Sequence, residues 1–135
     1  MKTLIAGVDC STQSTKVVVV ASETGEIVGT GHAKHAVTGT DGARETHPDV
    51  WWEALCLALG QTGLADQITA ISVAGQQHGM VCLDATGRPL RPAMLWNDTR
   101  SAPDAVELIE ALGGAAAWAA RIGVVPVASF TASKW

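Results

Sequence analysis

The segment most suited to chemistry is DCSTQSTK, which begins at Asp9, ends at Lys16 and lies between two apolar stretches. A tight turn between two strands presents backbone N–H groups in a small concavity, and Thr12, Gln13 and Ser14 would add side-chain donors. With the positive charge of Lys16, such a turn suits phosphate oxygens. Asp9 would hold a hydrated Mg²⁺, because magnesium takes one or two carboxylates and keeps several waters. The alternative is an ordinary polar hairpin turn, since serine and threonine are common in turns.

A second group of polar residues follows a predicted buried strand. Gln77 and His78 can donate hydrogen bonds to sugar hydroxyls and accept them. In α/β sheets with parallel strands, the carboxyl ends of the strands face the ligand cleft. For this pair the alternative is a polar turn with a surface histidine. Trp96 would either stack on the apolar face of a sugar or fill the core. Asp98 would either line the same cleft or pair with Arg100.

The composition restricts the class of protein. The chain has 135 residues, of which 47% are hydrophobic and 16% charged, and this predicts one globular domain rather than a disordered chain. A formal net charge of −4 argues against nucleic-acid binding. No apolar run approaches the about 20 residues of a membrane helix, and the run after Lys2 lacks a signal-peptide cleavage site.

The cysteines and histidines predict neither disulfides nor a metal centre. The three cysteines are odd in number and far apart, which is typical of reduced thiols in a cytoplasmic protein. His32, His35 and His47 share no metal-ligand spacing and are expected at the surface.

Four apolar stretches have the length and composition of strands. The first three are joined by short turns and predict an antiparallel meander. The fourth is apolar at nearly every position, so we expect it to lie in the centre of the sheet. These four strands are expected over residues 3–8, 15–21, 27–35 and 68–74.

A helix is expected between the third and fourth strands. Pro48 suits its first turn, and Asp49 suits the positive end of its dipole. Gly60 and Gly63 are candidate stops. The apolar residues at i, i+3, i+4 and i+7 that form its predicted inner face are Trp52, Leu55, Cys56 and Leu59.

Further elements are expected after the fourth strand. Residues 80–83 and 92–96 flank a turn and predict a hairpin. Ser101 and Asp104 fit a capping box that opens a helix. An alanine-rich helix follows over about residues 114–121.

The order of these elements predicts an α/β fold with a ribonuclease H-like mixed sheet. Three antiparallel strands, a helix and a strand that rejoins the sheet are the opening of the core of actin-like ATPases. A Rossmann fold would need a helix directly after the first strand.

Four motifs together resemble the FGGY family of carbohydrate kinases, over essentially the whole chain. DCSTQSTK is the first, and a tryptophan pair opens the predicted helix as it does in that family. GQQHGM from Gly75, LWNDTR from Leu95 and FTASKW from Phe130 follow in the family's order and approximate spacing. Ser11 stands where the family usually has glycine. A serine fits there only if its φ stays negative or its side chain is accommodated.

The resemblance implies that residues 1–135 are the N-terminal part of the first lobe of an FGGY kinase, with the family's aspartate base beyond Trp135. The implied reaction is phosphoryl transfer from Mg·ATP to a sugar hydroxyl, closest to the conversion of D-xylulose to D-xylulose 5-phosphate. The implied phosphate-binding residues are Asp9, Thr12, Gln13, Ser14 and Lys16, with Asp9 also binding the metal. The implied sugar-binding residues are Gln77, His78, Trp96 and Asp98.

Other functions stay open at this point. Within the family, the substrate would instead be ribulose, gluconate or glycerol. Outside enzymes, the chain would be a non-catalytic sugar- or nucleotide-binding module of the same fold. In either case the expected partners are a small sugar and ATP, with a homodimer as a further possibility. We expect the chain by itself to be inactive, because it lacks the family's aspartate base.

Overall fold

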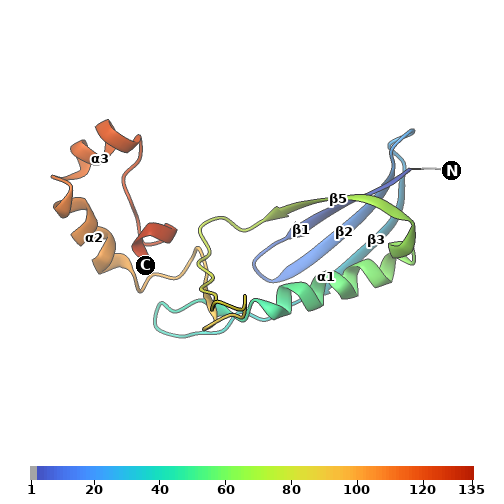
Figure 1. Ribbon diagram of the computed structural model, residues 1–135, viewed down its shortest axis with the longest axis horizontal. Helices are drawn as coiled ribbons and strands as arrows, with labels where there is room; N and C mark the ends of the chain where they lie inside the picture. Colours follow the sequence, from blue (N-terminus) through green and yellow to red (C-terminus); the bar gives the residue numbers. More distant parts are fainter. Residues whose placement is uncertain (1–2) are drawn as a thin grey trace. The chain divides into compact units, whose positions relative to one another are not determined.

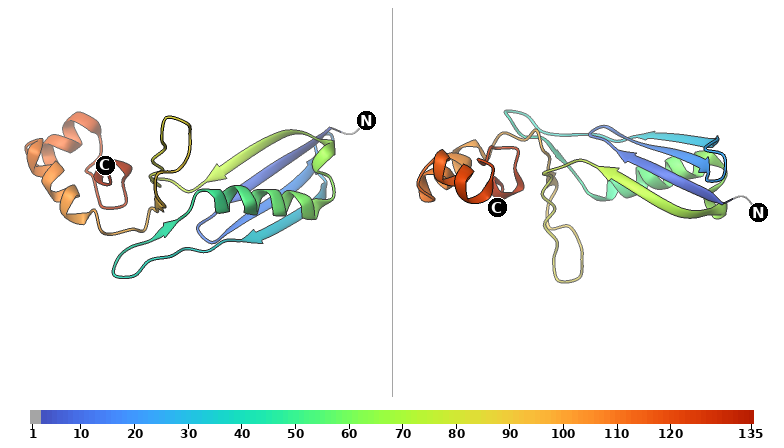
Figure 2. Two further views of the ribbon diagram at one scale, coloured as in Figure 1. Left: turned by 60° about the horizontal axis from the view of Figure 1, so that its bottom comes forward. Right: turned by 90° about the horizontal axis from the view of Figure 1, so that it is seen from above.

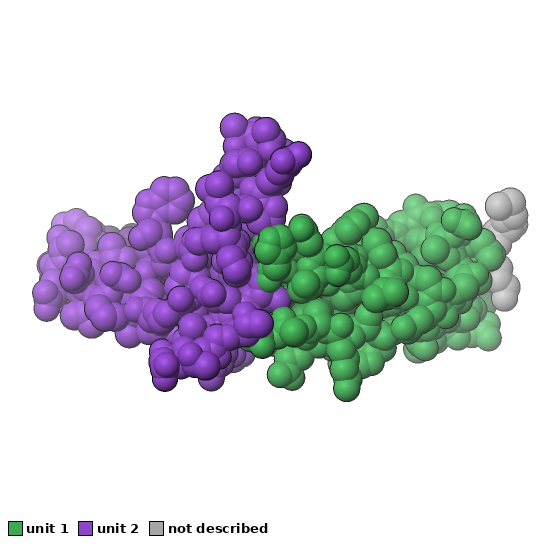
Figure 3. Space-filling view, turned by 90° about the horizontal axis from the view of Figure 1, so that it is seen from below, with its two compact units in different colours: residues 1–37, 47–76 green, residues 38–46, 77–135 purple. Residues whose placement is uncertain are grey.

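The structure, a computed structural model, describes residues 3–135 and divides by its internal contacts into two units (Figure 3). Unit 1 comprises Met1–Val37 and His47–Gln76, and unit 2 comprises Thr38–Thr46 and Gln77–Trp135. The phosphate-binding candidates therefore belong to unit 1, and the sugar-binding candidates belong to unit 2.

Unit 1 is built on a four-stranded sheet with the strand order β3-β2-β1-β5 (Figure 1). β2 is antiparallel to both β1 and β3, whereas β5 is parallel to β1. The strands are β1 (Leu4–Cys10), β2 (Ser14–Ala21), β3 (Ile27–Lys34) and β5 (Ile68–Gly75). The predicted meander and the mixed sheet are confirmed.

Helix α1, Asp49–Thr62, lies along one face of this sheet (Figures 1 and 2). It follows Pro48 and ends at Gly63, whose φ of 65° gives the left-handed conformation that terminates helices. Both ends agree with the prediction, while the other candidate stop, Gly60, lies inside the helix. A 3₁₀ turn, η1 (Ala65–Gln67), leads into β5.

The core of unit 1 lies between α1 and the strands β1, β2 and β3. Leu55 and Leu59, two members of the predicted inner face of the helix, pack at the border of this core. The buried core residues are Leu4, Ala6, Val8, Val17, Val19, Ala21, Ala33, Ala54 and Ala58.

The predicted inner face of α1 is wrong in part, because alanines rather than larger side chains point at the sheet. Ala54 and Ala58 are buried, whereas Trp52 is 68% exposed and Cys56 is also exposed. The reason is the close approach of the helix to β3 at Gly31, where a Cβ atom would lie 1.8 Å from the Ala58 carbonyl oxygen. Only small side chains fit between backbones this close.

β5 is the edge strand of the described sheet, not the central strand that its apolar sequence predicts. α1 packs mainly on β3 and β2 and leaves β5 uncovered. As a result, Ile71 and Val73 are 50% and 60% exposed. The apolar sequence of β5 therefore does not mark a buried central strand among the described residues.

Unit 2 contains two short strands and two helices. β4 (Glu45–Thr46) pairs antiparallel with β6 (Ala93–Met94). The two predicted helices are confirmed as α2 (Ala102–Ala111) and α3 (Ala115–Ile122), and the 3₁₀ turn η2 (Thr131–Ser133) follows them. No helix among the described residues is long and apolar enough to cross a membrane.

The predicted hairpin is confirmed in part. Met80 bridges Met94, and Leu83 bridges Pro89, as isolated antiparallel bridges instead of continuous strands.

The predicted capping box at the start of α2 is wrong. Ser101 does occupy the N-cap position, but its hydroxyl makes no capping hydrogen bond. It donates instead to the carbonyl oxygen of Ala128 at 2.8 Å. A tertiary contact has therefore replaced the local one.

Candidate functional site

The β1–β2 turn brings the candidates of unit 1 together. The Ser11 N–H donates to the Ser14 carbonyl oxygen at 2.9 Å and closes the turn around Thr12 and Gln13. The exposed Asp9 carboxylate lies at the base of the turn and accepts a hydrogen bond from the Ser11 hydroxyl at 2.8 Å. A carboxylate thus borders a compact loop that is rich in hydrogen-bonding groups.

Ser11 meets both conditions for replacing a glycine. Among the described residues, the non-glycine residues with positive φ are Asp41 and His78, so the backbone of Ser11 is not in the left-handed region. Its side chain is accommodated by the hydrogen bond to Asp9.

Asp9 suits a hydrated magnesium ion better than a metal held entirely by protein. Among the described residues, no group of three or more histidines, cysteines or acidic residues is placed to hold a metal. Mg²⁺ needs only one or two carboxylates and keeps its other waters. The Ser11 hydroxyl donates to Oδ2 of Asp9, and the exposed carboxylate is accessible to such an ion.

Asp9 and Lys16 lie side by side on the face of the sheet that α1 does not cover. They are register partners in the β1–β2 pair, and both side chains are exposed. Their chain neighbours Val8 and Val17 are buried on the helix side. Both residues also line a shallow pocket on this face. This arrangement offers one carboxylate for a cation and one ammonium for an anion.

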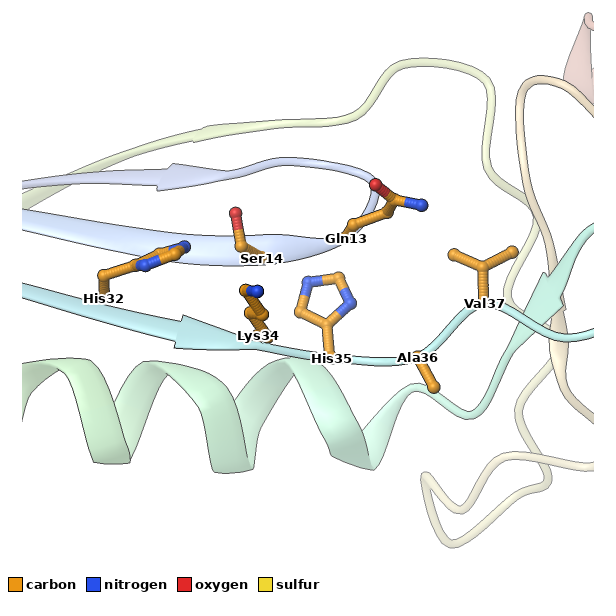
Figure 4. Close-up of a pocket in the computed structure, with 7 residues that line it drawn as sticks. All are labelled: Gln13, Ser14, His32, Lys34, His35, Ala36 and Val37. Atoms are coloured by element: carbon orange, nitrogen blue, oxygen red, sulfur yellow. The ribbon is translucent and has the colours of Figure 1, made fainter.

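A pocket of about 550 Å³ adjoins the same turn, where β2 begins and β3 ends (Figure 4). None of its lining residues is acidic; they are Gln13, Ser14, His32, Lys34, His35, Ala36 and Val37. His35 is half-buried, contrary to the surface position expected for it, and neither ring nitrogen makes a hydrogen bond of good geometry. Burial lowers the pKa of the His35 imidazole, and the Ser14 backbone partly opposes this shift. Because Lys34 lines the pocket and no acidic residue does, this pocket suits an anion.

Gln76, to which the sequence analysis gives no role, connects the end of β5 to the turn. Its Nε2 donates to the Ser11 carbonyl oxygen at 3.0 Å. The two segments meet because Gly75 pairs with Cys10 in the parallel β1–β5 register. This pairing is non-local, and the position of Gln76 directly after a strand is the only sign of it in the sequence.

In unit 2, Gln77 and His78 are both exposed on the segment that follows β5. His78 has a φ of 61°, a conformation that few non-glycine residues adopt. Its ring stacks on that of Phe130, with the ring centroids 4.6 Å apart and an angle of 19° between the ring planes. The stack brings together two of the motifs that lie far apart in the sequence.

Lys134 is buried and connects three segments of unit 2. Its ammonium donates to the carbonyl oxygens of Leu95 and Ser129 at 2.7 Å and of His78 at 2.8 Å. Burial lowers the pKa of the Lys134 ammonium, and the negative charge of Asp98 acts in the opposite direction. Sequence analysis gives this lysine no role, because lysines are mostly exposed and its partners are distant in sequence.

Asp98 is completely buried and pairs with Arg100, the second of the two expected alternatives. Arg100 also pairs with Glu45, and the Arg44 N–H donates to Asp98 Oδ2 at 2.8 Å. Burial acts to raise the pKa of the Asp98 carboxyl, but the hydrogen bonds from Arg100 and Arg44 outweigh it and hold that pKa below its usual value. The geometry gives Asp98 a structural role, and its contact with a sugar stays a prediction.

The residues between Leu95 and Asp98 offer further groups to a ligand. Trp96 is 46% exposed, so it does not fill the core of unit 2. The side-chain oxygen of Asn97 is buried and has no hydrogen-bond partner among the described residues. Asn97 is thus a polar candidate that the sequence analysis does not single out.

Comparison of the sequence with known proteins identifies close relatives. Residues 4–135 match the N-terminal domain of the FGGY family of carbohydrate kinases. The xylulose kinase of Streptomyces rubiginosus is 57% identical over 133 residues, which cover 98% of this chain and 27% of that kinase. The xylulose kinase of Escherichia coli K12 is 38% identical over 109 residues, 78% of this chain and 22% of that kinase. The chain thus spans about a quarter of the length of these relatives.

Solved structures agree with this comparison. The crystal structure of xylulose kinase from Bifidobacterium adolescentis matches 98% of this chain and 28% of its own, with a TM-score of 0.88 and 47% identity. The crystal structure of Plasmodium falciparum glycerol kinase with ADP also matches 98% of this chain and 28% of its own, with a TM-score of 0.82 and 27% identity. The predicted fold class, a mixed α/β sheet that forms part of an N-terminal kinase lobe, is confirmed.

Proposed function

The chain belongs to the FGGY family of carbohydrate kinases, and we propose that it supplies the phosphate turn and part of the sugar site for ATP-dependent phosphorylation of D-xylulose to D-xylulose 5-phosphate. The observation that carries this choice of substrate is the high identity, along almost the whole chain, to proteins named xylulose kinase.

On the phosphate side, the β1–β2 turn and its flanking residues place a carboxylate and an ammonium for binding Mg·ATP. Bound Mg·ATP supplies the phosphoryl group, and the metal neutralises charge on its oxygens. Asp9 would hold the hydrated metal through its exposed carboxylate. Lys16 offers its ammonium on the same face of the sheet. The remaining donors to the phosphates are Thr12, Gln13 and Ser14.

On the sugar side, the exposed residues of unit 2 recognise hydroxyls. Gln77 and His78 donate to sugar hydroxyls and accept from them, and the exposed ring of Trp96 packs against the apolar face of the sugar. Asp98 acts through the segment that carries Trp96, because its carboxylate is tied to Arg100 and Arg44. We assign no proton acceptor to this chain.

A hybrid protein tests the proposal. In this hybrid kinase, the chain replaces the matching segment of the Streptomyces rubiginosus xylulose kinase, with which it shares 57% identity. ADP release is measured with D-xylulose, D-ribulose, D-gluconate and glycerol. We expect the highest kcat/KM for D-xylulose, and turnover near the background rate for the 135-residue chain by itself.

The outcome has two informative alternatives. A folded hybrid kinase that prefers another of the four substrates would contradict the choice of D-xylulose. Sugar-dependent turnover by the chain alone, at the rate of the hybrid, would contradict the assignment of only a partial site to it.

A further inference from the structure

The buried ammonium of Lys134 forms a complete cage with three backbone carbonyls. An ammonium has three donors and no acceptor, and each donor here reaches one oxygen, on His78, Leu95 or Ser129, at 2.7–2.8 Å. No carboxylate lies within ion-pair distance of Lys134 among the described residues. Three backbone carbonyls, rather than a direct ion pair, therefore bind this ammonium.

Burial of a lysine is unfavourable unless its charge is compensated by well-placed partners. An apolar side chain of similar length would fill the same volume without that cost. The lysine is accordingly best explained by the positions of its acceptors, since only a multiple donor can bind three carbonyls that converge on one point.

Two of the three acceptors belong to the segments that carry the sugar-binding candidates. His78 itself supplies one carbonyl, and Leu95, which directly precedes Trp96, supplies another. These segments are 17 residues apart by residue number and would otherwise be joined mainly through the bridge between Met80 and Met94.

His78 is held twice by the segment that contains Lys134. Its carbonyl accepts from the ammonium, while its ring stacks on Phe130, four positions before the lysine in the sequence. Its φ of 61° is unfavourable for a residue with a Cβ atom, so the surrounding contacts must impose it. The Lys134 ammonium and the Phe130 ring are two such contacts.

We propose that Lys134 is a positioning residue that sets the conformation of the His78 and Trp96 segments for sugar binding. The proposal rests on the sugar site proposed above. It adds a backbone-directed lysine that need not touch the sugar and acts through the His78 and Leu95 carbonyls.

The test combines NMR of the 135-residue chain with the KM for D-xylulose of the hybrid kinase. Lys134→Met keeps the length of the side chain and removes all three donors, and Lys134→Arg keeps the charge with a different donor geometry. Ser133→Ala is the matched control, because it also removes a buried hydrogen bond to a carbonyl, that of Val127 at 3.0 Å, without touching His78. The indole N–H of Trp118, which donates to the Leu108 carbonyl at 2.9 Å, reports whether unit 2 is folded.

In Lys134→Met, we expect the His78 ring protons to lose the ring-current shift and the nuclear Overhauser contacts that Phe130 gives them. The KM for D-xylulose of the hybrid kinase should rise at least tenfold, and Lys134→Arg should restore part of both effects. Ser133→Ala should resemble the unsubstituted chain in both, even if its melting temperature falls.

The readouts separate the two proposals. If Lys134→Met stays folded and leaves the His78 signals unchanged, the positioning role is wrong, whatever the sugar affinity. If Lys134→Met disturbs His78 but the unsubstituted hybrid kinase shows no D-xylulose-dependent turnover, the positioning role stands and the proposed sugar site is wrong. If Lys134→Met loses the Trp118 signal, Lys134→Arg decides: an unaltered His78–Phe130 stack with this non-matching donor geometry would overturn the positioning role.

Discussion

At the scale of single residues, Asp9 has the most specific of the roles proposed on the phosphate side. Its exposed carboxylate would bind a metal whose charge matters most while phosphoryl transfer is in progress. We therefore expect Asp9→Ala in the hybrid kinase to lower kcat by about a hundredfold or more, with little change in the KM for D-xylulose. Asp66→Ala is the control, because Asp66 is an exposed acid in η1, before β5 begins. An intact kcat in Asp9→Ala would reduce the turn to an ordinary polar hairpin.

The substitution His78→Ala should affect mainly the KM for the sugar, whereas Asp9→Ala should affect mainly kcat. His78→Ala would remove the hydrogen bonds proposed between His78 and a sugar hydroxyl, so the KM for D-xylulose in the hybrid kinase should rise by about one to two powers of ten, or ~1.5–3 kcal/mol. The KM for ATP should barely change, because His78 is not part of the phosphate turn. His47→Ala is the matched control, since His47 is also exposed but has been given no role in binding. An unchanged KM for the sugar would place the sugar site elsewhere.

Residue types and spacing are enough to predict the Asp9 turn and the Gln77-His78 pair as candidates, because these are short contiguous motifs. They do not reveal how a candidate is held. Asp98 accepts a hydrogen bond from the Arg44 N–H, 54 positions away, and Lys134 binds carbonyls up to 56 positions away. Such contacts depend on which segments the fold brings together, and no local pattern encodes them.

At the scale of elements, local sequence likewise predicts some features, while others depend on contacts between distant segments. The ends of α1 follow from Pro48 and Gly63, whose effects are local. Which face of α1 is buried depends instead on the close approach of the helix to Gly31 of β3, and the periodicity of larger apolar residues predicts a different face. The edge position of β5 likewise depends on the neighbours of the strand rather than on its own sequence.

The close approach at Gly31 gives a stability prediction. A Cβ atom at this position would lie 1.8 Å from the Ala58 carbonyl oxygen, and both groups are backbone or attached directly to it. Gly31→Ala should therefore lower the free energy of unfolding by at least about 2–3 kcal/mol, measured by urea denaturation. Gly60→Ala makes the same change inside α1, where a Cβ atom has nothing within 4 Å, and should raise stability by about 0.5–1 kcal/mol. Equal effects at the two glycines would contradict the packing described here.

The network that joins Asp98 to β4 predicts a dependence on pH. Because the folded state lowers the pKa of the Asp98 carboxyl, its contribution to stability is present above the ordinary aspartate pKa of about 3.9 and is lost as the pH falls through the lower folded value. Asp98→Asn should therefore destabilise the chain by about 3 kcal/mol at pH 7 and by much less near pH 3. Urea denaturation at the two pH values measures the difference.

Asp84→Asn is the control for this experiment. The pKa of Asp84 is also lowered, through hydrogen bonds from the Arg88 and Thr86 backbone at an exposed turn. We expect a smaller loss at pH 7 there, because the group is not in a buried ion pair. Similar losses for the two variants would argue against a special contribution from the buried network.

At the scale of the whole molecule, the main feature is an apolar strand exposed at one edge of the sheet. β5 has β1 on one side and no strand on the other within the described residues, and Ile71 and Val73 lie exposed on it. An uncovered edge strand presents unpaired backbone N–H and C=O groups, to which a strand of a second molecule can form hydrogen bonds. Its apolar side chains also favour association.

We therefore expect the 135-residue chain to self-associate through β5, to an extent that rises with concentration. Val73→Lys places a charge on this edge and should shift sedimentation velocity profiles toward the monomer. Val106→Lys is the matched control, since Val106 is 54% exposed, close to the 60% of Val73, but lies on α2. If both variants shifted the profile equally, general apolar exposure would explain the association; if neither did, the β5 edge would not be an association surface. A selective effect of Val73→Lys would instead identify β5, an apolar edge strand that no helix covers, as the surface through which the chain associates.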